Sequence, residues 1–309
     1  MTKNDNENMG QVFSSRDQLS NLGFDDFTLG ALLEIFGATW MPRVMDGRCV
    51  LPQPDGFSGF DGCDLGSTVI ENLDLRGSSF RDSKLSFASL NGSTIAGCLF
   101  VGVIGVQARF NDSKANGAAF ECGRFEDADF SGSFLSGARF SNVNLHRANF
   151  SGAIMNGAYF NSCCIDESLF KRAIVEGATF ASCSLSRSLF KEAKMGGANI
   201  VSCAIEDGDF TQARMSGANL TNSDFRRSKF VSADLCGANL AGSKFETANM
   251  DGVELAASDC SGVNFRNACL RSAGFSGAIV RRADFSGAQL HRCRISGMKE
   301  KSESIGLPE

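Results

Sequence analysis

The chain has 309 residues, a formal net charge of −5, and 27 Phe and 34 Gly against one Trp and two His. No stretch approaches the roughly 18 apolar residues that a membrane-spanning helix needs, and the polar start MTKNDNENMG lacks the basic and then apolar run of a signal peptide, so we expect a cytoplasmic protein without a transmembrane segment, with secretion as an effector left open. The 12 cysteines are scattered without metal-ligand spacing, which excludes the common zinc motifs and predicts reduced thiols, no metal and no cofactor.

The first segments of the chain differ from everything that follows. Residues 1–12 are polar and are predicted to form a disordered tail. Residues 13–57 are predicted to form a small helical segment, because Ser14 and Asp17 resemble a capping box and Gly37 can end a second helix.

Large apolar residues recur at every fifth position from Phe60 to Ile295 without one change of register. Only Gly105, Ala115 and Cys260 interrupt a series of Phe, Leu, Ile, Met and Val, and a small residue usually stands two positions earlier. A period of five fits neither the 3.6 residues of a helix nor the 2.0 of a flat strand. The pattern therefore predicts a coil that turns every five residues, with the large and small residues pointing inward.

A second period of twenty residues is superimposed on the first. The segments that begin at Ser162, Ser182 and Ser202 (SCCIDESLF, SCSLSRSLF and SCAIEDGDF) resemble one another more than segments five residues apart do. Four turns of five residues therefore close one square coil. Residues twenty apart should stack into columns, and one internal column should consist of Cys163, Cys183 and Cys203.

Units such as ANLTN, ADFSG and ANLAG resemble the pentapeptide-repeat family. The resemblance covers residues 58–297 and implies an all-β fold, a right-handed quadrilateral β-helix of about 12 coils of twenty residues each. Members of this family that confer fluoroquinolone resistance resemble duplex DNA in shape and charge, and they bind type II topoisomerases in its place.

An open solenoid end exposes core residues and unpaired strand edges, which promotes aggregation unless something covers them. Segment 13–57 is therefore expected to cap the Phe60 end, with Trp40 and the strand-like residues around Cys49 as further cover. Its acidic residues would equally suit a docking element. The sequence leaves capping and recruitment both open.

Glycine recurs at twenty-residue steps along one side of the predicted square. A turn residue with φ above zero, as in a type II turn, explains such a column. A face kept free of side chains for a partner also explains it, and both interpretations stay open. The column comprises Gly97, Gly117, Gly137, Gly157, Gly177, Gly197, Gly217, Gly237 and Gly277, with Ala257 interrupting.

The repeat region is electrically balanced, with 24 acidic and 24 basic residues between 58 and 297. On one outer face the sign of the charge alternates from coil to coil, and opposite charges on neighbouring strands attract. We interpret this series as a structural ladder that neutralises itself, which imitates phosphate poorly and disfavours direct nucleic-acid binding. The ladder comprises Asp127, Arg147, Glu167, Arg187, Asp207, Arg227, Glu246 and Arg266.

Two surfaces are candidates for contact with a partner. One is an apolar cluster at positions that face outward in the repeat. The other is the locally basic C-terminal end of the array, before a polar tail at 298–309, although a solvated surface cluster also explains that end. The candidate residues are Ile154, Tyr159, Leu169, Ile174, Leu189, Arg281, Arg282, Arg292 and Arg294.

No sequence motif for catalysis is present: GxxxxGK, HExxH and GxSxG are all missing, and the two histidines lie far apart. No catalytic residue is predicted and the chain is not expected to be an enzyme, since the interior of the solenoid is filled. We expect a scaffold, regulator or effector that binds a protein partner, as a monomer or a dimer. The alternative, implied by the resemblance, is a DNA-mimicking protein that binds DNA gyrase and confers quinolone resistance or toxin immunity.

Overall fold

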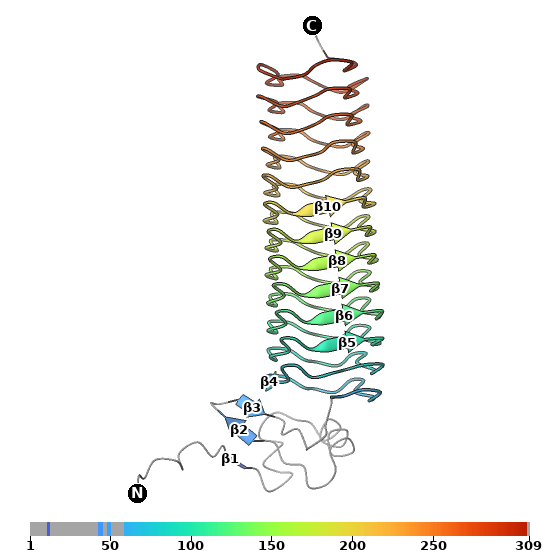
Figure 1. Ribbon diagram of the computed structural model, residues 1–309, viewed down its shortest axis with the longest axis vertical. Coiled ribbons are helices and arrows are strands. Elements are labelled where there is room, and N and C mark those ends of the chain that lie inside the picture. The colour runs from blue at the N-terminus through green and yellow to red at the C-terminus, as the bar shows by residue number, and fades with distance from the viewer. Residues whose placement is uncertain (1–10, 13–42, 46–47, 51–58, 308–309) are drawn as a thin grey trace, which may run out of the picture.

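The computed structural model describes residues 11–12, 43–45, 48–50 and 59–307, and the last of these ranges forms a rod of stacked coils (Figure 1). Within the rod the pairing between coils is parallel, and up to Lys299 each pair joins residues twenty positions apart. The fold is therefore a parallel β-solenoid. The predicted all-β class and the twenty-residue coil are confirmed.

Each coil has four faces of five residues. Face one holds residues 78–82, face two 83–87, face three 88–92 and face four 93–97, and the equivalent residues follow at steps of twenty. We call a set of residues twenty apart a column. The residue just before each large inward residue forms the bridges, so it defines the outer column of its face.

Continuous strands lie on face one. Six of them form a parallel sheet in the order β10-β9-β8-β7-β6-β5. Continuous strands of this sheet thus occur in six successive coils, whereas about 12 coils were predicted. The neighbouring coils have isolated bridges in place of strands and keep the same register. The strands are β5 (Leu99–Val101), β6 (Ala119–Glu121), β7 (Arg139–Ser141), β8 (Tyr159–Asn161), β9 (Thr179–Ala181) and β10 (Asn199–Val201).

The core consists of side-chain columns that run along the rod. On face one, phenylalanine rings stack from Phe60 to Phe180, with the centroids of Phe140 and Phe160 4.6 Å apart. A second stack on face three meets the first edge to face, as Phe150 does with Phe140 at 6.0 Å. Each such pair contributes about 0.5–1.5 kcal/mol beyond the area that it buries. The inward large residues of the sequence pattern thus form the core.

The small inward residues fill the corners between these stacks. Cys163, Cys183 and Cys203 are all buried, as the column prediction required. The Cys163 thiol donates to the Phe140 carbonyl oxygen at 3.3 Å, and Cys183 and Cys203 repeat this bond one coil further on. The buried thiols are therefore satisfied by backbone acceptors.

Every corner of the coil uses a backbone with positive φ. At Gly97, Gly157 and Gly277 the φ values are 67°, 63° and 70°, which confirms the prediction for the glycine column. The other corners use the same conformation with side chains present, for example φ of 57° at Arg147 and 63° at Glu167. Positive φ is therefore a property of the whole solenoid and does not single out the glycine column.

The N-terminal end of the rod is extended by a small sheet. Strands β1 (Gln11–Val12), β2 (Arg43–Met45), β3 (Arg48–Val50) and β4 (Leu73–Asp74) follow in that order, and β4 belongs to face four of the first coil. The β3 strand runs parallel to β4, with Cys49 opposite Leu73. The strand predicted around Cys49 thus covers the open edge of face four.

The described residues contain no helix. Of the predicted helical segment 13–57, residues 43–45 and 48–50 form strands. The rest of it, with Trp40, lies outside the described part of the chain, as do residues 1–10 of the predicted tail. Gln11 and Val12, the end of that predicted tail, pair with β2.

At the C-terminal end the coil continues beyond the boundary expected at residue 297. Lys299 bridges Ile279, and Ile305 bridges Asp284 after one extra residue. The backbone N–H of Phe285 donates to the Ile305 carbonyl oxygen at 2.8 Å. Part of the polar segment 298–309 therefore forms the last partial coil.

Candidate functional site

The outer column of face four changes character along the rod. Phe134, Ile154 and Ile174 lie one coil apart and are joined by bridges, and the same column continues with Lys194 and Arg214. Phe134 keeps 41% of its surface exposed, and Ile154 and Ile174 are half-buried. Three apolar side chains are thus followed by two cations along one column.

At the corner after face four the second residue of the turn is glycine in most coils, while the first carries a side chain such as Asn156 or Glu176. A Cβ added to Gly137, Gly157 or Gly177 would meet no heavy atom within 4 Å, so packing does not require glycine there. Backbone geometry does not require it either, because Arg147 and Glu167 adopt the same φ at another corner. On the other flank Gly152 has the same open surroundings. Gly152 and Gly157 thus stand on the two flanks of Ile154, each beside one turn residue with a side chain.

Tyr159 lies across this glycine corner, in the outer column of face one and in β8. Its side chain is 41% exposed. It borders a shallow surface depression of about 610 Å³ that spans the corner. The depression is lined by Glu121, Gly137, Arg139, Ser141, Gly157 and Tyr159.

The apolar residues predicted as one cluster lie on three different faces. Ile154 and Ile174 share face four, Leu169 and Leu189 are bridged on face three, and Tyr159 stands on face one. Sequence reasoning missed Phe134, which extends the face-four column by one coil. Its spacing of twenty residues before Ile154 was the signal that identifies it.

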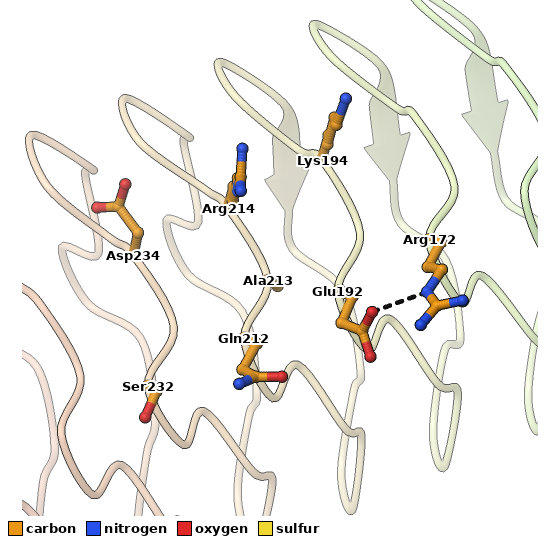
Figure 2. Close-up of a pocket in the computed structure, with 8 residues that line it drawn as sticks. All are labelled: Arg172, Glu192, Lys194, Gln212, Ala213, Arg214, Ser232 and Asp234. Carbon is orange, nitrogen blue, oxygen red and sulfur yellow. Dashed lines mark hydrogen bonds and ion pairs between the residues drawn. The ribbon is translucent and has the colours of Figure 1, made fainter.

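A shallow groove of about 760 Å³ follows the corner between faces three and four (Figure 2). Arg172 donates to Glu192 at 2.7 Å in this groove, and Lys194 and Arg214 lie on the same side of successive coils. Toward the C-terminal end the column reaches Asp234, which accepts from the Ser216 hydroxyl at 2.6 Å. The lining residues are Arg172, Glu192, Lys194, Gln212, Ala213, Arg214, Ser232 and Asp234.

Cations dominate this corner. Lys171 and Lys191 lie on face three beside Arg172 and Glu192, and both are exposed. The hydrogen bond from Arg172, with the nearby charges of Lys171 and Lys191, holds the pKa of Glu192 below its usual value. Four cations have no carboxylate oxygen within 4.0 Å among the described residues: Lys171, Lys191, Lys194 and Arg214. These four cations therefore have no ion pair among the described residues, although Asp234, next in the column, interacts with the charge of Arg214.

Face two shows the opposite arrangement. The guanidinium of Arg147 contacts Asp127 at 2.6 Å. The same pairing recurs between Arg187 and Glu167 at 2.8 Å and between Arg227 and Asp207 at 2.9 Å. These six residues occupy one corner column at steps of twenty. The structure thus places the first six residues of the predicted charge ladder in direct pairs.

The last two ladder residues lie in the neighbouring column. Glu246 accepts from the Asn264 amide at 2.6 Å, and Arg266 contacts Asp284 at 3.7 Å. The two residues therefore contact other partners and not each other.

The four predicted basic residues near the C-terminal end lie on three different faces of the rod. Arg282 pairs with Glu303 at 2.7 Å, and Arg294 reaches Glu254, two coils away, at 2.5 Å. Arg294 spans that distance because Gly274 has no side chain between them. Arg281 and Arg292 lie on faces one and three, so the structure does not bring the four arginines together.

Free cysteines are the main reactive groups in the described part of the chain, and Cys122 among them is exposed. No cluster of His, Cys, Asp and Glu there could hold a metal ion. Burial raises the pKa of the Cys98 and Cys260 thiols to about 12, so they are protonated at neutral pH and unreactive. None of the described elements is a helix with the length and apolar character needed to cross a membrane.

Solved structures with a similar fold include three repeat proteins. HetL, involved in heterocyst differentiation regulation in the cyanobacterium Nostoc, is 21% identical over 76% of this chain and 88% of its own, with a TM-score of 0.33. Full-length QnrB1, a plasmid-mediated fluoroquinolone resistance protein, is 18% identical over 67% and 92%, with a TM-score of 0.40. Rfr23 from the cyanobacterium Cyanothece is 16% identical over 43% and 90%, with a TM-score of 0.20. Similarity of this degree carries no argument about function.

No curated protein sequence matches the chain. Two family models do match it, and together they cover most of the rod. The model described as pentapeptide repeat region matches residues 165–240. The model described as pentapeptide repeats (8 copies) matches residues 60–97, 124–162, 228–259, 237–271 and 258–297. With the twenty-residue coil and the inward columns, these matches show that the chain belongs to the pentapeptide-repeat family.

Proposed function

We propose that this protein is a non-enzymatic scaffold that binds a protein partner through face four of the rod. The observation that carries the proposal is the column Phe134, Ile154 and Ile174, where apolar side chains occupy outward positions in three successive coils. Single exposed apolar residues are ordinary, but a contiguous series is typical of an interaction site. The bare glycine corner beside it would let a partner approach the backbone closely.

The fold itself supports a binding role. A solenoid presents a long surface on rigid, repeated elements, and its interior is filled by side chains. Ile154 and Ile174 are held by two backbone hydrogen bonds per coil, for example from the Ile154 N–H to the Ser133 carbonyl oxygen at 2.9 Å. A surface fixed in this way loses little conformational freedom when a partner binds.

Affinity capture with matched variants tests this proposal. The full-length protein is immobilised as wild type, as the double variant Ile154→Ser, Ile174→Ser, and as Ile104→Ser. Ile104 is 40% exposed on face two, so it controls for the loss of an exposed isoleucine. We expect a protein from the source cells that binds wild type and Ile104→Ser but not the double variant. Retention of the same proteins by all three would refute the role of face four.

Gyrase binding by DNA mimicry is the alternative, and the charge distribution counts against it. DNA presents uninterrupted negative charge, whereas Asp127, Glu167 and Asp207 on face two are each neutralised by an arginine. In a gyrase supercoiling assay, with and without a quinolone, we expect the protein to leave the activity unchanged. Inhibition or protection from the drug would favour the alternative.

A further inference from the structure

We infer that the partner on face four is an acidic protein segment, with apolar side chains at one end and carboxylates at the other. This inference rests on the proposed function, because it names the chemistry of that partner. Phe134, Ile154 and Ile174 provide the apolar half of the surface, and Lys194 and Arg214 provide the cationic half along the same column.

The cations at this end of the column differ from the arginines of the face-two ladder, although other cations of the rod, such as Lys114 in the same column, also lack an ion pair among the described residues. Arg147, Arg187 and Arg227 on face two each have a carboxylate within hydrogen-bond distance. Lys194 and Arg214 have none within 4.0 Å among the residues that the structure describes, and both are exposed. Asp234, the next residue of the column, interacts with the charge of Arg214 without forming an ion pair. Cations that form no ion pair within the protein favour an anionic partner by charge complementarity.

Two further lysines reinforce the same end of the surface. Lys171 and Lys191 flank the corner groove, and their charges help to keep Glu192 ionised. In the groove Glu192 is already bound by Arg172, and Asp234 stands one coil beyond Arg214. Lys171, Lys191 and Lys194 have no ion pair among the described residues, so their charges are available to a partner.

The dimensions of the column fit a short segment. From Phe134 to Arg214 there are four steps between coils, about 19 Å at the usual strand spacing. A helix of about 13 residues has that length. A segment lying parallel to the rod would place its apolar side chains over Ile154 and its carboxylates over Lys194 and Arg214.

The surface suits a protein better than a nucleic acid or a membrane. Single-stranded nucleic acids are bound by several aromatic side chains on which bases stack, and this column has only Phe134. A continuous row of phosphates or lipid headgroups would also meet Glu176 and Asp234, which stand beside the cations. A protein segment can place its carboxylates selectively and avoid both.

Selection from a displayed library of random peptides of about 16 residues, enough to span the column as a helix, tests the inference on the intact protein. We expect the selected peptides to carry a net negative charge and Leu, Ile or Phe. Selection on the variant Lys194→Glu, Arg214→Glu should invert the preferred charge, and selection on Ile154→Ser, Ile174→Ser should remove the preference for apolar residues.

Uncharged or basic peptides, or a charge preference unchanged by Lys194→Glu, Arg214→Glu, would overturn the inference. Sedimentation of the protein with vesicles of phosphatidylserine and phosphatidylcholine would also overturn it. The same holds if the wild-type protein binds a single-stranded oligonucleotide and the variant Ile154→Ser, Ile174→Ser does not. Failure of the proposed function is a different result. In that case the isoleucine variant would retain the same cellular proteins as wild type, whatever the charge of the selected peptides.

Discussion

Faces two and four of the rod share one backbone and one kind of core, yet they present opposite surfaces to solvent. Face two carries a corner column of alternating acids and arginines that pair with one another at 2.6–2.9 Å. Face four carries an apolar column beside a column of glycine, followed by Lys194 and Arg214, which form no ion pair among the described residues. Interactions within the protein satisfy the first surface and leave the second unsatisfied.

The difference separates the inward residues, which folding requires, from the outward residues of face four, which folding does not require. Both faces have inward residues that are fully buried, such as Ile165 behind face two and Met195 behind face four. The repeat therefore accounts for the inside of both faces equally. It does not account for an apolar column in contact with water, and a binding partner does.

The largest predicted effect tests whether the two faces are equivalent inside. Ile165→Ala and Met195→Ala each remove a fully buried side chain between stacked coils. Each should lower the free energy of unfolding by about 2–5 kcal/mol, because a cavity remains in the column. Denaturant titration followed by circular dichroism measures both. A loss confined to one of the two variants would show that the faces differ in their core as well as on their surface.

An intermediate effect concerns the glycine corner of face four. Gly157→Asn introduces a side chain at a φ of 63°, where a Cβ meets no atom within 4 Å. Asparagine tolerates this conformation, so we expect the stability to change by no more than about 1 kcal/mol. Partner binding should weaken because the new side chain stands beside Ile154. The control is Asn142→Gly at the corner after face one. If both variants bind the partner equally well, the glycine corner of face four is not part of the binding surface.

The smallest effect concerns the ion pairs of face two. Hydrogen bonds from Arg147 and Arg227 lower the pKa of Asp127 and Asp207. Since the folded pKa is depressed, the stabilisation is present above the unfolded value near 3.8 and is lost as the pH falls through the folded value. Arg147→Gln with Arg227→Gln should slightly flatten the acid side of a plot of melting temperature against pH. A change at pH 7 as large as that of Ile165→Ala would contradict the weak, solvent-screened role.

The fold could be predicted from the sequence because the inward residues follow the five-residue pattern almost without exception. Even Gly105, which interrupts the series, fits the core: the ring of Phe125 fills its space, and an added Cβ would lie 2.7 Å from that ring. Around Ile104 apolar residues occupy positions that face outward in the repeat, yet the chain keeps the register through bridges from Ile104 to Lys84 and Arg124. Packing inside the coil tolerates such departures without shifting the strands.

The surface was less predictable, for two physical reasons. The apolar candidates were grouped by closeness in sequence, whereas only residues twenty apart share a face, which separates Tyr159 from Ile154. Whether a cation is paired depends on side-chain geometry that the repeat does not fix. Arg294 finds Glu254 across Gly274, while Arg214 has no such partner among the described residues.

The most direct test compares equal charge changes on the two faces. Lys194→Gln with Arg214→Gln on face four and Arg187→Gln with Arg227→Gln on face two each remove two positive charges. Fluorescence anisotropy measures the affinity of each variant for an acidic peptide selected on the wild-type protein. We predict that the face-four variant loses at least about tenfold in affinity, while the face-two variant stays within about twofold of wild type. An equal loss in both variants would show that only the net charge of the rod matters and would contradict a binding surface on face four.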